Sequence, residues 1–523
     1  MKPILIVGAG PVGLTTALAC QFYGLPFMLF EEDGSFSAAA KAGTILTRTL
    51  EAFRRFGIAD EVLAKALRVD EIGDIERATN RSRLPVRTGL LWDETLYPFV
   101  INLPQHHLEP ILAEALPEGT TNLDHKLIAF EQGDGDVSAT FETSDGIRTV
   151  QGSYLLACDG GRSTIRSNLG IQVEGESFDV RYMLVDIKVD LDVRDQRDFP
   201  YLAYFSDPDE WMILVRQPHC WRFIFPLPPG APEATPDELR AKAQHFIGEV
   251  STLEVLNTVI YRIHHRIASE WRVGRVFLMG DAAHLLTPMW ALGLNSGILD
   301  VLNLTWRLAW VARGWANDDL LDGYAAEQQP LATHGAGELA EAARAYMSGM
   351  ARGDAVDVDE LHNAMTRTLL GVRLDVNGTG DWSIVTSPGS GIKSGDRIPD
   401  MNVHLGNGTV GRVHQLVDDS FVAFHFCDAR RKPDMPDDLP GLRNFLVSRW
   451  DAPLDSGLRE RAILDVGNRL FDRLGIEPDT VVLVRPDDHV AAVLPMQPGA
   501  VHRAYNDIMH LRKAALSHEQ FAQ

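Results

Sequence analysis

Three glycines near the start of the chain, Gly8, Gly10 and Gly13, have the spacing G-x-G-x-x-G. They follow a short apolar stretch at residues 3–7, which we predict to be a strand. In such a loop the first glycine permits a tight turn, the second lets a pyrophosphate approach the backbone, and the third lets the next helix pack on the strand. The spacing therefore predicts a dinucleotide site, followed by a helix at residues 14–22.

An acidic side chain completes this pattern. A second apolar stretch at residues 26–30 is predicted to be a strand and is followed by Glu31. A carboxylate about 20 residues after the glycines is placed to accept hydrogen bonds from the ribose hydroxyls of the nucleotide. The glycines alone are weak evidence, but strand, glycines, helix, strand and acid in this order are a strong signal.

A second ligand loop is predicted within residues 275–314. Residues 276–279 are an apolar run typical of a buried strand, and the run ends at Gly280 and Asp281. Glycine lets the backbone approach a ligand, and the carboxylate can accept hydrogen bonds from hydroxyl groups. Pro288 and Gly293 then interrupt the chain as a loop.

A helix after this loop is indicated by apolar residues at helical spacing from Ile298 to Val311. We predict that it starts near Asn295 and Ser296. Its first turn would offer unpaired N–H groups and the positive end of the helix dipole, which together favour an anionic ligand.

A third loop has the same construction. An apolar strand at residues 154–157 leads into Cys158, Asp159 and Gly160, and Arg166 follows. This arrangement predicts another ligand contact, although Asp-Gly-Gly is also a common turn by itself. Both interpretations stay open on the residues alone.

Several polar residues between these loops also have two interpretations. Lys41 and Arg48 could contact phosphate or belong to a solvated positive face, and Gln105 could face a ring or simply begin a helix. His106 and His107 are adjacent and would lie on different faces of that helix, so a shared metal ion is not expected.

The middle of the chain changes character. Alternation and turn signals at residues 123–154 predict β-hairpins, and residues 175–268 predict a separate antiparallel sheet inserted into the nucleotide domain. Aromatic residues of this sheet could line an aromatic-substrate pocket, although most are better explained as core. They are Tyr201, Tyr204, Phe205, Trp211, Trp221, Phe223 and Phe225. Arg222 could hold an acidic substrate or a phenolate, or form a surface ion pair.

Composition sets the broad class. The 523 residues are too many for one core, so two to three domains are expected. The net charge of −23 argues against nucleic-acid binding and against docking to anionic membranes. Four scattered cysteines without a C-x-x-C pair indicate neither a disulfide framework nor a thiolate metal site, and they favour a reducing compartment. The glycines of the first apolar run argue against a signal peptide there.

The later part of the chain divides again. Residues 320–370 are predicted to be largely helical, and a linker rich in Gly, Ser and Thr follows at 378–395. Residues 396–497 alternate strand-like segments, such as 421–426 and 481–484, with helical patterns. We predict a small α/β domain there.

The assembled motifs, GAGPVG with Glu31, CDGGRS around Asp159 and GDAAH from Gly280, resemble the FAD-dependent aromatic hydroxylases. These single-component (class A) flavoprotein monooxygenases include the para-hydroxybenzoate and phenol hydroxylases. The resemblance covers roughly residues 1–370. SGDRIPDMNVHLGNG at 394–408 and VRPDDHVA at 484–491 are similar to the thioredoxin-like C-terminal domain of the phenol hydroxylase branch.

This resemblance implies an α/β fold with three domains. A Rossmann-like FAD-binding domain of the glutathione-reductase type would comprise residues 1–174 and 269–385, including the helical segment 320–370. An inserted antiparallel-sheet domain at 175–268 would bind the substrate, and residues 386–523 would form the thioredoxin-like α/β domain. Since that last domain has a lone Cys427, we expect packing or dimer contacts rather than disulfide exchange.

The resemblance also implies roles for individual residues. Gly8, Gly10 and Gly13 would bind the FAD pyrophosphate, and Glu31 the adenosine ribose. The phosphates and ribityl chain would contact Arg48 and Gln105, with Lys41 standing where an arginine is frequent. Asp159 beside Gly160 would serve FAD and the approach of the nicotinamide, and Asp281 after Gly280 would hold ribityl and phosphate oxygens. The ring would be bordered by Pro288 and, at its pyrimidine side, by the backbone of Gly293, Leu294 and Asn295.

One departure from the family is notable. Many relatives have a Gly-Gly-Gln-Gly run where this chain has Trp290, Ala291, Leu292 and Gly293. We therefore expect Trp290 to shape the substrate pocket, together with Pro288 and Arg222 as the residues nearest the reaction.

The chemistry implied by the resemblance is hydroxylation of a phenolic ring, ortho or para to its hydroxyl. NADH or NADPH would reduce the FAD, O2 would add as a C4a-hydroperoxide, and its distal oxygen would attack the ring. The expected partners are a small aromatic substrate and O2, in the cytoplasm, with monomer and homodimer both open.

Three other functions remain to be distinguished. The segment from Trp221 to Pro226 distantly echoes the tryptophan-rich signature of flavin-dependent halogenases, but Phe223 replaces its second tryptophan. A FAD-dependent epoxidase or dehydrogenase would be revealed by the substrate class that stimulates turnover. A non-catalytic flavin-binding protein would bind FAD without consuming NAD(P)H.

Overall fold

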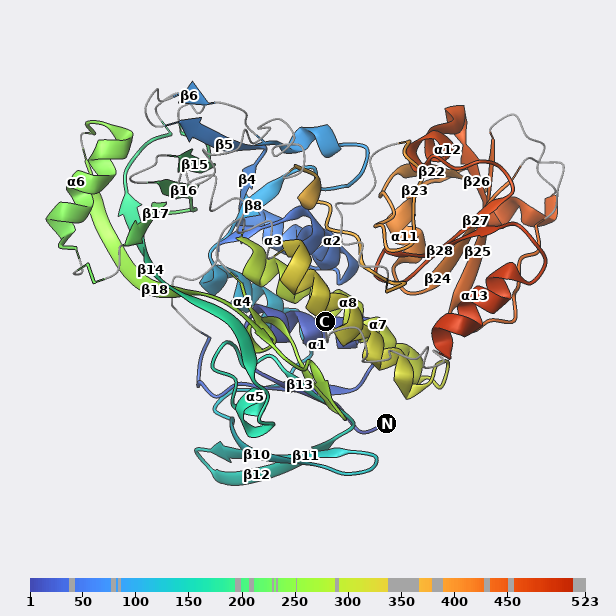
Figure 1. Ribbon diagram of the computed structural model, residues 1–523, viewed down its shortest axis with the longest axis horizontal. Helices are drawn as coiled ribbons and strands as arrows, with labels where there is room; N and C mark the ends of the chain where they lie inside the picture. The colour runs from blue at the N-terminus through green and yellow to red at the C-terminus, as the bar shows by residue number, and fades with distance from the viewer. Residues whose placement is uncertain are drawn as a thin grey trace, which may run out of the picture. The chain divides into compact units, whose positions relative to one another are not determined.

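The computed structural model describes residues 1–36, 43–76, 81–82, 86–192, 199–206, 211–227, 230–231, 234–250, 252–286, 291–336, 366–378, 389–427, 433–449 and 456–510 (Figure 1). The fold is mixed α/β and contains several sheets. Two compact units divide the chain. The first comprises Met1–Leu302 with Gln329–Val372, and the second Asn303–Gln328 with Arg373–Gln523.

A parallel sheet holds the three loop motifs of the first unit. Strand β1 (Ile4–Val7) pairs in parallel with β2 (Phe27–Phe30) and with β13 (Leu155–Ala157), and β13 pairs in parallel with β20 (Val276–Leu278). The carboxyl ends of parallel strands meet at one edge of a sheet. The sheet therefore brings together loops that are up to about 270 residues apart in the sequence.

Two helices start earlier than the sequence predicts. Helix α1 (Pro11–Phe22) begins at Pro11, because proline suits the first turn of a helix, where its missing N–H costs nothing. Helix α7 (Leu292–Ala312) begins at Leu292, so Asn295 lies inside the first turn rather than ahead of it. No helix within the described ranges is both long and apolar enough to cross a membrane.

The second sheet of this unit is larger. Strand β14 (Val173–Lys188) pairs antiparallel with β18 (Glu254–Ala268) and with β17 (Trp221–Leu227). Strand β16 (Met212–Arg216) lies between β17 and β15 (Leu202–Ser206), again antiparallel. These strands confirm that residues 175–268 contribute an antiparallel sheet.

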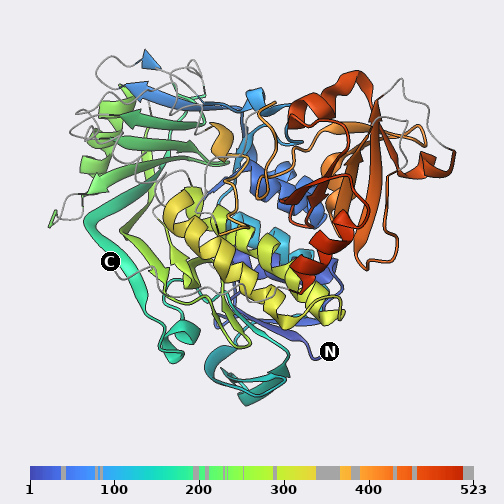
Figure 2. The ribbon, with the colours of Figure 1, turned by 45° about the vertical axis from the view of Figure 1, so that its right-hand side comes forward.

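The large sheet also contains a strand from a distant part of the chain, for which no structure was predicted from the sequence. Strand β5 (Glu71–Glu76) pairs in parallel with β15 and antiparallel with the short strands β6 (Arg81–Ser82) and β7 (Val86–Arg87) (Figure 2). The prediction of a wholly antiparallel sheet built from residues 175–268 alone was therefore incomplete. Strands of two to six residues give too short an alternation to be recognised.

The two faces of the large sheet have different partners. Helix α6 (Pro236–Ile247) starts at a capping box formed by Thr235 and Glu238, and it covers one face. Because side chains alternate along a strand, every second residue faces this helix. The core on that side contains Met183, Val185, Ala203, Phe205, Met212, Leu214, Trp221, Phe223, Phe225, Leu239, Ala243 and Phe246. Phe205, Trp221, Phe223 and Phe225 are thus core residues.

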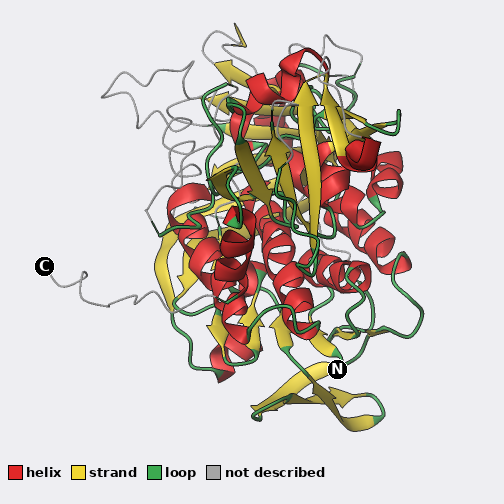
Figure 3. Cartoon of the chain, turned by 90° about the vertical axis from the view of Figure 1, so that its right-hand side faces the viewer, coloured by secondary structure: helices red, strands yellow, loops and turns green. Residues whose placement is uncertain are grey.

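Two small sheets complete the first unit. Strands β10 (Lys126–Gln132), β11 (Val137–Thr143) and β12 (Gly146–Gly152) form the predicted antiparallel hairpins (Figure 3). Strand β8 (Val100–Asn102) pairs with β3 (Thr44–Ile45) and with β4 (Leu67–Val69), and helices α2 (Thr47–Arg55), α3 (Ala59–Lys65) and α4 (Gln105–Glu114) adjoin these segments in the chain.

The second unit is built around a seven-stranded sheet in the order β23-β22-β26-β25-β24-β27-β28. Strands β24 (Phe421–Phe426), β25 (Leu442–Arg449) and β26 (Ala462–Asp465) run parallel, and β27 (Thr480–Val484) runs antiparallel to β24. The outer strands are β22 (Asn402–Leu405), β23 (Val410–Arg412) and β28 (Val490–Pro495), and the helices are α8 (Asp322–Pro330), α11 (Val413–Val417), α12 (Arg469–Leu474) and α13 (Ala500–Met509). The predicted small α/β architecture of this region is confirmed.

Candidate active site

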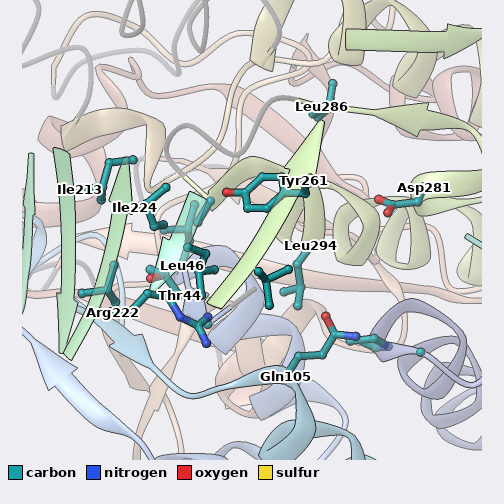
Figure 4. A pocket seen from close by; sticks show the side chains of 18 of the residues that line it. Thr44, Leu46, Gln105, Ile213, Arg222, Ile224, Tyr261, Asp281, Leu286 and Leu294 are labelled. Atoms are coloured by element: carbon teal, nitrogen blue, oxygen red, sulfur yellow. The ribbon is translucent and has the colours of Figure 1, made fainter. Parts of the chain in front are cut away.

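One cavity of about 600 Å³ in the first unit extends from the edge of the parallel sheet to the large sheet (Figure 4). The loops that follow the parallel strands line one part of it, and alternate residues of the large sheet line the other. The lining on the loop side includes Gly10, Pro11, Val12, Gln105, Cys158, Gly160, Asp281, Gly293 and Leu294. The lining on the sheet side includes Ile72, Leu184, Leu202, Tyr204, Ile213, Val215, Gln217, Arg222, Ile224, Val259 and Tyr261.

The glycine loop shows why each glycine stands where it does. Gly8 has a φ of +102°, and a Cβ there would lie 2.3 Å from the carbonyl oxygen of Cys158. A Cβ on Gly13 would lie 1.8 Å from the carbonyl oxygen of Gly8. Gly10 differs, since a Cβ built on it meets no atom within 4 Å, and Gly10 lines the cavity. Two glycines thus permit packing, whereas the third leaves the backbone open to a ligand.

Glu31 lies directly after β2 and reaches back to this loop. Its Oε2 accepts a hydrogen bond from the backbone N–H of Ala9 at 2.6 Å. The carboxylate is therefore held beside the glycine loop, where the sequence predicted it. The adjacent Glu32 is exposed.

Gly280 and Asp281 follow β20. Gly280 has a φ of +56°, and a Cβ on it would meet the Val12 side chain of α1 at 2.9 Å. Asp281 is exposed and lines the cavity. The positive φ at Gly280 thus turns the chain toward α1 and leaves the next carboxylate at the cavity wall.

His284 takes part in a buried ion pair. Its Nε2 lies 2.9 Å from Oδ2 of Asp300 on α7, and its ring stacks on Trp271 with centroids 5.2 Å apart. Burial lowers the pKa of His284, but the Asp300 carboxylate outweighs this effect, and the pKa is raised above its ordinary value. Asp300 Oδ2 also accepts the backbone N–H of Gly280 at 2.8 Å. This pair fixes the loop that carries Asp281.

The Asn295 side chain anchors the start of α7. Its Oδ1 accepts from the backbone N–H of Leu46 and from the Thr49 hydroxyl at 2.9 and 2.7 Å. Its amide donates to the carbonyl oxygens of Thr44 and Ala291 at 3.1 and 2.7 Å. The sequence pointed to Asn295 as a backbone contact for a ring, and the structure shows in addition that its side chain joins α7 to residues 44–49.

Gln105 and Arg48 are placed differently. Gln105 begins α4, donates to Glu109 Oε1 at 2.7 Å and lines the cavity. Arg48 is 4% exposed and donates to Glu51 Oε2 at 2.6 Å. Arg48 is not among the described residues that line the cavity, so its predicted phosphate contact stays a prediction.

Asp159 adjoins the cavity between two lining residues, Cys158 and Gly160. Its Oδ2 accepts the backbone N–H of Ile165 at 3.2 Å, at the start of helix α5 (Thr164–Asn168). Burial raises the pKa of the Asp159 carboxyl, and hydrogen bonds from Ser163 and the backbone oppose that effect only in part. Within the structure described, Asp159 orders the third loop.

Arg222 lies on β17 opposite Asp186 of β14. Its Nε and Nη2 donate to the two oxygens of Asp186 at 2.8 and 3.1 Å. Arg222 is only 3% exposed and lines the cavity. Each interpretation of Arg222 thus holds in part. Arg222 lines the cavity, where it could contact a substrate, and it also forms an ion pair, but that pair is buried and not on the surface.

Sequence reasoning missed several residues of this wall. Gln217 and Tyr261 line the cavity and carry polar groups, and Asp186 pairs with Arg222 from outside the described lining. Burial raises the pKa of the Tyr261 hydroxyl. For Asp186 and Tyr261 the available signal was a polar or charged residue within an apolar strand, at a position that alternates with core residues. Lys41, Pro288 and Trp290 lie outside the described residues.

Comparison with known proteins decides the family. A model described as "FAD binding domain" matches residues 1–336. The 3-(3-hydroxy-phenyl)propionate/3-hydroxycinnamic acid hydroxylase of Comamonas testosteroni is 27% identical, over 97% of both chains. The chain belongs to the FAD-dependent aromatic hydroxylase family. The predicted resemblance to the aromatic hydroxylases is confirmed, and the protein is an aromatic monooxygenase.

Two further comparisons agree. The para-nitrophenol 4-monooxygenase of Pseudomonas sp. (strain WBC-3) is 27% identical over 63% of this hydroxylase and 83% of the relative. The crystal structure of aklavinone-11 hydroxylase with FAD and aklavinone has a TM-score of 0.79 and 24% identity, covering 97% of this chain and 99% of that one. At this identity the second comparison shows a shared fold.

Proposed function

We propose that this protein uses NADH or NADPH and O2 to hydroxylate a phenolic compound ortho or para to its hydroxyl. The single observation that carries the proposal is the shared cavity, in which the FAD-type loops and an apolar sheet wall border one space. FAD, when bound, accepts a hydride from the nicotinamide and activates O2 for transfer of one oxygen atom. A ring lying against the sheet wall would be within the same water-poor space.

The residues on the loop side fit FAD. The space at Gly10, which a Cβ would occupy, admits a pyrophosphate, and the carboxylates of Glu31 and Asp281 can accept hydrogen bonds from ribose and ribityl hydroxyls. The first turn of α7, with Gly293 and Leu294 at the cavity, offers the positive end of a helix dipole to the electron-rich part of the ring.

The residues on the sheet side would orient the substrate. Ile213, Ile224 and Val259 supply an aliphatic surface, while Tyr261, Gln217 and Arg222 supply polar groups. An apolar pocket with a few polar groups is typical of small-molecule sites. We assign the substrate to this sheet, FAD to residues 1–174 and 269–385, and a thioredoxin-like packing role to residues 386–523.

The first test measures NADH and NADPH oxidation by the FAD-loaded protein with a panel of phenols, and quantifies hydrogen peroxide alongside. A true substrate should stimulate oxidation with little peroxide. Stimulation with stoichiometric peroxide would identify a ligand that triggers flavin reduction without accepting oxygen. No response to any phenol would contradict the phenolic substrate class.

Isotope labelling tests the oxygen-transfer step. In an atmosphere of oxygen-18 gas, the hydroxylated product should gain one labelled oxygen atom per molecule. Product without label would contradict the proposal, and a halogenated product that depends on chloride would point to a different flavin enzyme.

A further inference from the structure

The Gln217 side chain is buried at the cavity wall without the bonds that a buried amide needs. It is 1% exposed, and neither its Nε2 nor its Oε1 has a hydrogen-bond partner within the described residues. Leaving a buried polar group unpaired costs roughly 1–3 kcal/mol. A group in this state at a cavity wall is ready to bond a ligand that supplies both a donor and an acceptor.

The position of Gln217 is set by the backbone. It follows β16, and its N–H donates to the carbonyl oxygen of Cys220 at 2.8 Å, which closes the hairpin to β17. On the other side, a Cβ on Gly43 would lie 2.6 Å from Gln217 Nε2. The absence of a side chain at Gly43 therefore leaves room for the carboxamide at the cavity wall.

The neighbouring cation is already neutralised. Arg222 pairs across the hairpin with Val215, two residues before Gln217. It is the one cation among the described lining residues that the large sheet contributes, and Asp186 engages it at 2.8 and 3.1 Å. A carboxylate on a ligand that approached Arg222 would find the Nε and Nη2 groups already bonded to Asp186, whose negative charge would repel it. Like charges repel strongly where water is scarce.

We propose that Gln217 and the Arg222–Asp186 pair form a charge-balanced polar subsite, which binds an uncharged hydroxyl or carbonyl group of the aromatic substrate and rejects a carboxylate. This inference rests on the proposed hydroxylase function and narrows its substrate to neutral aromatic compounds. The amide of Gln217 donates to a carbonyl oxygen and accepts from a hydroxyl. The aliphatic residues around it favour an otherwise apolar ring.

The test compares ligands that differ only in charge. Isothermal titration calorimetry on the FAD-loaded protein, without nicotinamide, would measure binding of 3-(3-hydroxyphenyl)propionate and its primary amide. Two matched pairs on other rings would be added, 3-hydroxybenzoate with 3-hydroxybenzamide and 3-hydroxy-2-naphthoate with its amide. We expect the amide of at least one pair to bind at least tenfold more tightly than its acid. Equal or tighter binding of the acids, or no binding of any amide, would overturn the proposal.

Two variants assign the preference to residues. Asp186→Asn should strengthen acid binding at least tenfold, since it removes the negative charge that repels the acid and keeps the positive charge of Arg222. Gln217→Leu should weaken amide binding at least fivefold and should fold well, because it removes an unpaired buried amide. An unchanged acid-to-amide ratio in Asp186→Asn, or unchanged amide affinity in Gln217→Leu, would refute the assignment.

A matched control and a second readout complete the design. Asp192→Asn removes the partner of Arg216, another Arg–Asp pair at the large sheet, which does not line the cavity among the described residues. It should leave the acid-to-amide ratio unchanged. Binding is measured without turnover, so the two proposals can fail separately. A retained preference for the amide without any hydroxylated product would contradict only the proposed function. Hydroxylation without a preference for the amide over the acid would contradict only the proposed subsite.

Discussion

The imidazole of His284 and the carboxylate of Asp300 form a buried pair with 2.9 Å between Nε2 and Oδ2. His284 lies on the short strand β21 (His284–Leu285), which pairs with β18, and Asp300 lies on α7, so the pair joins an edge of the large sheet to the helix whose first turn lines the cavity. The same carboxylate oxygen holds the N–H of Gly280. The loop that presents Asp281 is thus positioned by a group outside the cavity wall.

Loss of this pair should destabilise the protein and make its stability less dependent on pH. Asp300→Asn is expected to lower the free energy of unfolding by about 3 kcal/mol, since it leaves a buried histidine without its counter-charge. The pKa of folded His284 is raised above the unfolded value of about 6.5. The stabilisation is therefore full below about pH 6.5 and is lost as the pH rises through the raised pKa.

The measurement is urea unfolding of the wild type, Asp300→Asn and His284→Gln from below about pH 6.5 upward. The advantage of the wild type should shrink as the pH rises. The same advantage at every pH would show that folding does not change the pKa of His284, and it would contradict this prediction.

Gly10 and Gly13 should respond oppositely to the same substitution. Gly13→Ala places a Cβ 1.8 Å from a backbone oxygen, so we expect a loss of about 1–3 kcal/mol in stability. Gly10→Ala meets no atom and should change the stability of the FAD-free protein by less than about 1 kcal/mol. Its FAD affinity should nevertheless fall at least tenfold. Thermal unfolding and FAD titration separate the two effects, and Gly10→Ala with full FAD affinity would place the pyrophosphate elsewhere.

Glu31 and Glu32 form a natural pair of variant and control. Glu31→Ala removes the carboxylate that is fixed to the Ala9 N–H, whereas Glu32→Ala removes an exposed neighbour of equal charge. Charged hydrogen bonds contribute about 1.5–3 kcal/mol. FAD affinity should therefore drop roughly tenfold or more in the first variant and stay unchanged in the second. Equal behaviour of the two would indicate a general charge effect.

Asp281→Ala should release FAD more readily. The side chain lines the cavity, and its loss removes an acceptor for ligand hydroxyls. We expect the FAD dissociation constant, measured by equilibrium dialysis, to rise about tenfold. Glu270→Ala, at an exposed residue outside the described cavity lining, is the control. Full retention of FAD by Asp281→Ala would contradict the assignment.

The loop side of this site could be predicted because its signals are local. Gly8, Gly10 and Gly13 follow a strand directly, and Glu31 ends the next strand, so spacing along the chain already implies proximity in a parallel sheet. Close backbone contacts also restrict Gly8 and Gly13 to glycine, which makes these two positions recognisable in a single sequence. The short distances from a Cβ on Gly8 or Gly13 to neighbouring carbonyl oxygens show this restriction directly.

The sheet side could not be predicted, because it depends on pairing between distant strands. Asp186 meets Arg222 only because β14 and β17 pair in one register, and a shift by one residue would send one of them into the core under α6. Similarly, β5 joins the sheet from about 130 residues away. In the sequence, only an alternation of polar and apolar residues indicates these strands, and the alternation does not show which strand pairs with which.

The Arg222–Asp186 pair should show strong energetic coupling in a double-mutant cycle. Arg222→Leu or Asp186→Leu alone leaves a buried charge without its partner, at a cost of about 3–5 kcal/mol. The double variant removes both charges and should lie within about 1 kcal/mol of the wild type, because apolar replacements of a buried pair are often neutral. The free energies of unfolding in urea check this. If the losses of the two single variants add up in the double variant, the two residues do not stabilise one another. The surrounding aliphatic side chains would then be what holds this part of the cavity wall in place.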